Sequence, residues 1–105
     1  QIKELDMSLD LLITLDNGES KRLFISEALH SELFGPLTRW TSYKELRKIS
    51  DYYKANVKFN DKDVLKFLSE LTDVAQRIDR EKDELQKIIE SLRVLKIKSL
   101  RVTGD

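Results

Sequence analysis

The residues best suited to binding chemistry gather in one stretch near the middle of the chain. Tyr, Trp and Arg are the residue types most enriched at protein-interface hot spots, and the same mixture can stack on single-stranded nucleic acid and neutralise it. An amphipathic helix also produces this pattern routinely, with its aromatic residues in the core and its Lys and Arg in solvent. The stretch is therefore a candidate partner-binding surface, with ordinary helix packing as the alternative. It comprises Arg39, Trp40, Tyr43, Lys44, Arg47, Lys48 and Tyr52.

A second candidate surface is acidic and lies later in the chain. It consists of Asp79, Glu81, Asp83 and Glu84, with Asp73 shortly before them. Such a run of carboxylates is most often simply solvated, but it can also attract a basic protein partner. We therefore treat it as a second candidate binding surface.

No set of residues is typical of an active site. There is no cysteine, so thiolate catalysis and cysteine-bound zinc are excluded. The single histidine, His30, has no second His or Cys to form a metal site with, and we expect it to be a partly exposed helix residue. The glycines Gly18, Gly35 and Gly104 are too scattered to form a phosphate-binding loop. We therefore expect a protein that is not an enzyme and that holds no metal or cofactor.

The composition predicts one domain without membrane contact. A chain of 105 residues is long enough for one hydrophobic core, and its zero net charge argues against a general nucleic-acid binder. No apolar run reaches the roughly 20 residues that span a bilayer, and no signal-peptide pattern opens the chain, so we expect a cytoplasmic protein. The only methionine is Met7, which leaves open whether residues 1–6 belong to the natural chain.

The most regular pattern in the sequence predicts a single long helix over Asp61–Leu92. Its apolar residues recur at steps of three and four, and Asn60 stands before it as a plausible N-cap. A helix of this length would extend roughly 48 Å, beyond the body of so small a domain. A break in the polar patch Asp79–Glu84 is the alternative, but opposite charges spaced four apart favour continuity. The apolar stripe comprises Val64, Leu68, Leu71, Ala75, Ile78, Leu85, Ile89 and Leu92.

The N-terminal part of the chain predicts a β-hairpin. Apolar residues alternate from Leu5 to Leu15, and the turn residues Asp16-Asn17-Gly18 follow before Lys21–Ser26 resumes a strand. A loop of three residues, with Gly18 in the left-handed conformation, sets Leu9 across from Ile25 and Leu11 across from Leu23. A two-residue loop would place fewer apolar residues on one face. We therefore predict the three-residue loop.

Shorter elements complete the predicted fold. Ser26 can cap a helix that Gly35-Pro36 ends, and Ser42-Tyr43-Lys44-Glu45 has the capping-box pattern of a second helix that runs to about Tyr53. Asn56–Phe59 is either a brief strand or a connection. Leu95–Val102 alternates with a change of phase near Ser99, which predicts a strand with a bulge.

These elements predict an α+β fold. The N-terminal hairpin and the C-terminal strand form an antiparallel sheet, on which two short helices and one long helix pack. Because a helix longer than its domain leaves surface for a partner, the leading hypothesis is a non-enzymatic protein-binding module. By analogy of size, this could be a small inhibitor of the toxin-immunity or antitoxin kind. The alternatives are a protein that dimerises through the stripe from Val64 to Leu92, and a single-stranded nucleic-acid binder that uses Arg39–Lys58.

Overall fold

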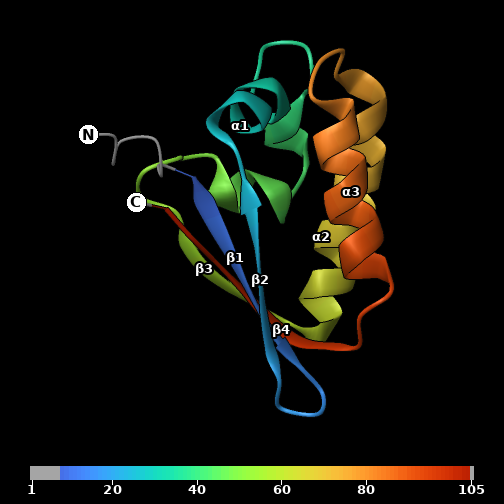
Figure 1. The fold of residues 1–105 in the computed structure, drawn as a ribbon. Coiled ribbons are helices and arrows are strands. Elements are labelled where there is room, and N and C mark those ends of the chain that lie inside the picture. The colour runs from blue at the N-terminus through green and yellow to red at the C-terminus, as the bar shows by residue number, and fades with distance from the viewer. Residues whose placement is uncertain (1–7, 105) are drawn as a thin grey trace, which may run out of the picture.

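The chain folds into a four-stranded antiparallel sheet with its helices on one face, an α+β arrangement (Figure 1). The computed structural model describes residues 8–104, and its strands lie in the order β2-β1-β4-β3. The strands are β1 (Leu9–Leu15), β2 (Ser20–Ile25), β3 (Asn56–Asn60) and β4 (Ile97–Thr103). The helices are α1 (Glu27–Leu33), α2 (Asp61–Val74) and α3 (Lys82–Arg93), with short 3-10 turns η2 (Trp40–Ser42), η3 (Leu46–Ile49) and η4 (Ala75–Arg77).

The predicted hairpin is confirmed, including its register. Leu9 pairs with Ile25 and Leu11 with Leu23, and the Leu15 N–H donates to the Glu19 carbonyl at 2.8 Å across a three-residue loop. Gly18 has a φ of +91°, the left-handed conformation that the loop requires. Leu9, Leu11 and Ile13 are buried, as the alternation predicts. The start of the alternating stretch, Leu5 to Met7, lies outside the described residues.

The last strand occupies the middle of the sheet. β4 pairs with β1 as predicted, and its register slips by one residue between Thr14 and Leu15, so the bulge falls at Lys98, beside the predicted Ser99. Of the two readings of Asn56–Phe59, the strand is the correct one: β3 pairs antiparallel with the other edge of β4. The sheet therefore has one strand more than the hairpin and the C-terminal strand provide.

The first helix also agrees with its prediction. Ser26 is its N-cap, and the Leu29 N–H donates to the Ser26 hydroxyl at 3.1 Å. Leu29 and Leu33 are fully buried in the core. Gly35 and Pro36 follow the helix end at Phe34.

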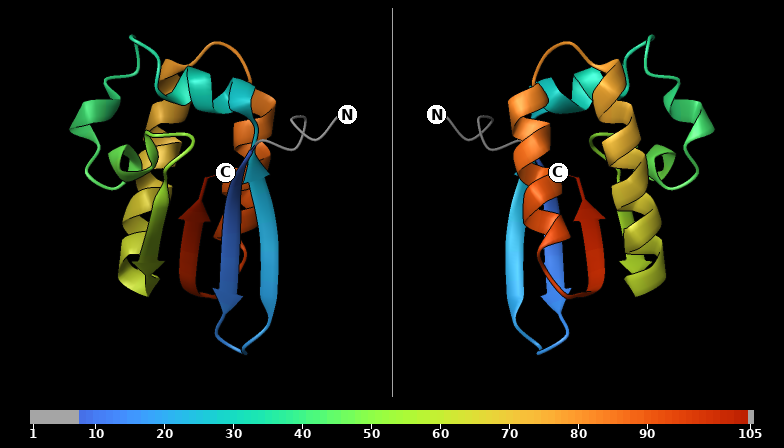
Figure 2. Two further views of the ribbon diagram at one scale, coloured as in Figure 1. Left: turned by 90° about the vertical axis from the view of Figure 1, so that its left-hand side faces the viewer. Right: turned by 90° about the vertical axis from the view of Figure 1, so that its right-hand side faces the viewer.

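The prediction of one helix over Asp61–Leu92 is wrong. α2 ends in the turn η4, Ile78 has an extended backbone (φ −106°, ψ 151°), and α3 starts at Lys82 and runs back beside α2 (Figures 1 and 2). Folding back buries the apolar side of α3, where each side chain contributes about 1.5–3 kcal/mol. A charge pair that favours continuity contributes only about 0.2–0.5 kcal/mol, so burial decides the outcome. The buried side chains of α3 are Leu85, Ile88, Ile89 and Leu92.

The prediction of a regular helix from Ser42 to Tyr53 is also wrong. The Ser42 hydroxyl donates back to the Arg39 carbonyl at 2.7 Å instead of capping a following helix. The backbone N–H groups of Glu45 and Leu46, at the start of η3, donate to the carboxylate of Glu70 on α2, at 3.0 and 2.7 Å. A carboxylate distant in sequence therefore supplies the cap, and the segment forms two short turns rather than one helix.

One hydrophobic core lies between the sheet and the helices. It includes Phe59 and Phe67, whose rings stack at 4.8 Å, and it extends under η3 through Leu46 and Ile49. The opposite face of the sheet carries no described helix (Figure 2). None of the helices in residues 8–104 combines the length and apolarity needed to cross a bilayer.

Candidate functional site

The basic and aromatic group does not form one continuous surface. Arg39, Lys44, Arg47 and Lys48 are exposed, Trp40 and Tyr43 are half-buried, and Tyr52 is buried. The Trp40 ring packs edge-on against Phe34, with 5.3 Å between ring centroids. Tyr52, a predicted partner-binding residue, is only 8% exposed, whereas its neighbour Tyr53 is 53% exposed.

Tyr43 connects the basic and aromatic group to the end of α2. Its hydroxyl donates to the Asp73 carboxylate and accepts from Nε of Arg77 at 3.0 Å. Burial, followed by the hydrogen bond to Asp73, raises the pKa of Tyr43 above its ordinary value. The protonated hydroxyl therefore bridges the Asp73 carboxylate and the Arg77 guanidinium.

His30 is buried, contrary to the predicted partial exposure. Its Nε2–H donates to the Ile49 carbonyl at 2.9 Å, which links α1 to η3. The imidazole lies between the Phe34 and Tyr52 rings, at 4.5 and 4.9 Å. Burial lowers the pKa of His30, although the Ile49 hydrogen bond and Asp51 oppose this shift. This histidine is a core residue.

Lys48 is similarly engaged within the domain. Its ammonium group lies 2.8 Å from the carboxylate of Glu45, which is itself 2% exposed, and 5.8 Å from the Phe59 ring centroid. A buried carboxylate needs such a partner. Lys48 therefore neutralises Glu45. Arg47, although exposed, also donates to the Thr41 carbonyl, at 3.3 Å.

The acidic group divides between solvent and structure. Asp79, Glu81 and Asp83 are exposed around the start of α3. Glu84 instead accepts hydrogen bonds from the Ser26 backbone N–H at 2.9 Å and from the Ser26 hydroxyl at 2.7 Å. Its carboxylate therefore fastens α3 to the start of α1. Within the described part of the chain, no group of three or more acidic or His side chains is arranged to hold a metal ion.

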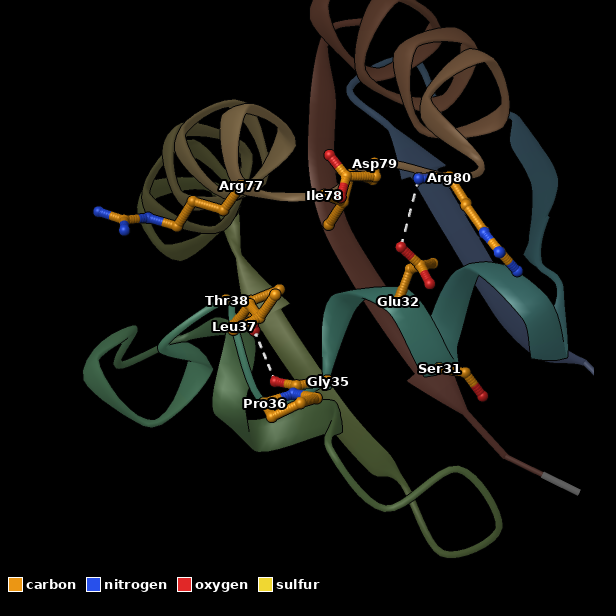
Figure 3. Close-up of a pocket in the computed structure, with 10 residues that line it drawn as sticks. All are labelled: Ser31, Glu32, Gly35, Pro36, Leu37, Thr38, Arg77, Ile78, Asp79 and Arg80. Carbon is orange, nitrogen blue, oxygen red and sulfur yellow. Dashed lines mark hydrogen bonds between the residues drawn. The ribbon is translucent and has the colours of Figure 1, made fainter.

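A hollow of about 210 Å³ lies between the two predicted groups, and we call it the linker hollow (Figure 3). One wall is the end of α1 with the loop that follows, and the other is the linker between α2 and α3. The Arg80 N–H donates to the Glu32 carboxylate at 3.3 Å and joins the walls. The lining residues are Ser31, Glu32, Gly35, Pro36, Leu37, Thr38, Arg77, Ile78, Asp79 and Arg80.

The rim of the linker hollow combines apolar exposure with backbone strain. Leu37 is 78% exposed, whereas its neighbour Thr38 is buried and donates to the Leu33 carbonyl at 2.7 Å. Each wall ends in a non-glycine residue with positive φ, Arg39 at 57° and Glu81 at 63°. These are the two such residues in the described chain, and a side chain in this region costs on the order of 1–2 kcal/mol. Strain of this kind clusters at functional sites.

Only part of this site could be predicted from the sequence. Arg39, Asp79 and Glu81 were identified by residue type, but the hollow exists only because the chain turns between α2 and α3. Leu37 carries a signal that could have been used, because an apolar residue directly after Gly35-Pro36 falls outside any periodic face. Comparisons of the chain with protein-family models, with curated proteins and with solved structures gave no match.

Proposed function

We propose that this protein is a non-enzymatic binding module that contacts another protein through the linker hollow and its rim. The observation that carries the proposal is Leu37, a large apolar side chain held 78% exposed by the buried Thr38 beside it. An exposed apolar side chain within a ring of charged residues matches the apolar centre and polar rim of protein interfaces. Arg39, Asp79, Arg80 and Glu81 supply charges of both signs around it.

The size of the hollow favours a protein partner over a small substrate. Ligand pockets usually enclose about 300–1,000 Å³, whereas this hollow holds about 210 Å³ and lies at the surface. A space of this size suits a single partner side chain. The strained backbone at Arg39 and Glu81 fixes the two walls that such a side chain would enter.

The predicted long helix, from which the sequence suggested a binding role, does not support this proposal. The stripe from Val64 to Leu92 is largely buried within the domain, so it is not available as a dimer seam. A homodimer would need a different surface. Inhibition by direct contact, as in the toxin-immunity and antitoxin kinds of protein, is the more specific form of the proposal.

Paired surface variants test the proposal. Leu37→Asp places a charge on the rim, while Leu65→Asp makes the same change at a side chain that is 69% exposed on α2, away from the hollow. We expect one protein from the native host lysate to be captured by the wild type and by Leu65→Asp, and at least tenfold less by Leu37→Asp. Equal capture by both variants, with equal melting temperatures, would reject the linker hollow as the contact surface. Sedimentation that shows a concentration-dependent dimer lost in Leu37→Asp would identify the partner as a second copy.

A further inference from the structure

The open face of the sheet carries a row of positive charge that no described element covers (Figure 2). Side chains alternate between faces, so the residues between the buried positions of each strand point to this face. One row across all four strands contains Arg22, Leu12, Arg101 and Lys58, as the registers Leu12↔Arg22, Leu12↔Arg101 and Lys58↔Arg101 establish. Arg22, Arg101 and Lys58 are exposed. We call this set the cation row.

The cation row destabilises the fold. Lys58 and Arg101 lie directly opposite each other on neighbouring strands, about 4.8 Å apart along the hydrogen-bonding direction. Like charges in direct cross-strand register are destabilising. Arg22 adds a third positive charge beyond Leu12. An anion placed over the row would relieve this repulsion.

No described carboxylate forms an ion pair with the row. The Arg101 guanidinium donates to the neutral side-chain oxygen of Asn56 at 2.8 Å. The one ion pair between described side chains is Lys48–Glu45, on the helical side of the molecule. Asp10 is the only acidic residue on the open face of the described strands, and it lies one row away, beside Phe24.

We propose that the cation row binds an acidic polypeptide segment of a partner protein. Leu12 lies within the row and Phe24, 51% exposed, lies next to it, so the surface offers apolar contact together with positive charge. A segment in which acidic and apolar side chains mix matches both features. The inference rests on the proposed protein-binding function but uses a separate surface from the linker hollow.

Two other occupants fit the surface less well. Single-stranded nucleic acid binds through successive aromatic platforms. On this face the four described strands present one exposed aromatic residue, Phe24, beside the carboxylate of Asp10. The acidic cluster that a second copy could offer, Asp79, Glu81 and Asp83 around the start of α3, lies on a different part of the surface from the sheet face. Such a contact would join unlike surfaces and extend into an open chain of molecules rather than close into a dimer.

The test uses three peptide or nucleotide probes and two matched triple variants. The probes are a short fluorescein-labelled peptide that alternates Glu and Val, the same peptide with Gln in place of Glu, and a single-stranded oligothymidine. The first variant combines Arg22→Gln, Lys58→Gln and Arg101→Gln. The control combines Lys21→Gln, Lys62→Gln and Lys96→Gln, which removes the same charge from exposed residues elsewhere.

We expect the Glu peptide to bind the wild type and the control, and to bind the cation-row variant about tenfold more weakly by fluorescence anisotropy. Binding should weaken towards about 0.15 M salt, and the Gln peptide should not bind. Equal affinities for the two variants, or tighter binding of oligothymidine than of the Glu peptide, would overturn the proposal. Leu37→Asp should leave peptide binding unchanged, so failure of the linker hollow and failure of the cation row give different results.

A thermal measurement tests the charge repulsion without any probe. Lys58→Glu converts the like-charged pair with Arg101 into an opposite pair and should raise the melting temperature by about 2–5 °C. Lys21→Glu, on the opposite edge of the sheet and on its other face, should not. An unchanged or lower melting temperature for Lys58→Glu would contradict the charge repulsion on which the cation-row proposal depends.

Discussion

The role of an individual charged residue in this protein depends on neighbours that are distant in sequence. Glu84 belongs by residue type to the acidic group, yet it accepts two hydrogen bonds from Ser26. Glu70, which no pattern singles out, caps the turn at Glu45 and Leu46. Residue type therefore predicted which side chains could bind something, but not which of them the fold already uses.

His30 makes folding stability depend on pH. Burial lowers its pKa in the folded protein below the unfolded value of 6.5, so the unfolded chain binds the extra proton more readily. The contribution of neutral His30 to the free energy of unfolding is therefore fully present above about pH 6.5. It decreases as the pH drops from there towards the folded pKa, by at most about 1.4 kcal/mol per pH unit. Chemical denaturation at pH 7.5 and at lower pH measures this loss.

His30→Gln is the matched control for this effect. A glutamine can still donate to the Ile49 carbonyl but does not titrate. Because the chain has one histidine, the variant should lose the pH dependence above the range in which carboxylates titrate. An equal loss of stability in the wild type and in His30→Gln would show that another group is responsible.

At the scale of elements, locally determined features were predicted correctly. The hairpin register follows from alternation and from turn chemistry within Leu9–Ile25, and the structure confirms it. The end of α2 could not be predicted in this way, because no Gly or Pro marks it. What ends α2 is the burial gained when α3 folds back on the sheet. The sequence showed two signs of this: the polar patch Asp79–Glu84, in which a break was the alternative, and the missing apolar residue of the stripe at Lys82, where α3 starts.

Ile78 tests whether burial, rather than weak helix propensity, breaks the helix. Its side chain is 2% exposed although its backbone is extended. Ile78→Ala improves helix propensity but removes buried apolar surface, so we expect a loss of about 2–4 kcal/mol in the free energy of unfolding. Gln76→Ala, at an exposed position in η4, should change it by less than about 0.5 kcal/mol. A more stable Ile78→Ala protein would mean that propensity dominates at this position.

The molecule as a whole has one core. The sequence predicted the fold class that surrounds this core, but not all of the segments that contribute to it. The α+β fold and the sheet pairing of β4 with β1 agree with the prediction. The stretch from Leu46 to Ala55 overlaps the helix that was predicted from Ser42 to about Tyr53. It instead contributes four buried residues, Leu46, Ile49, Tyr52 and Ala55, to the common core through irregular turns. Such packing depends on contacts across the fold and leaves no periodic pattern.

A single core predicts a single unfolding transition. The chain's one tryptophan, Trp40, lies in the irregular segment, whereas α2 and α3 dominate the helical signal. Tryptophan fluorescence and far-UV circular dichroism should therefore give coincident denaturation curves. Leu46→Ala should shift both curves together, by about 2–5 kcal/mol. An earlier fluorescence transition would show that residues 36–55 unfold independently of the sheet.

The central position of β4 also sets the order in which the domain can be completed. Translation releases the chain from its N-terminus, so the hairpin and β3 leave the ribosome with no strand between them. The edges of β1 and β3 that β4 will occupy remain open until residues 97–103 emerge. Until then the growing polypeptide exposes two unpaired strand edges, which are the surfaces most prone to aggregation and most suited to chaperones.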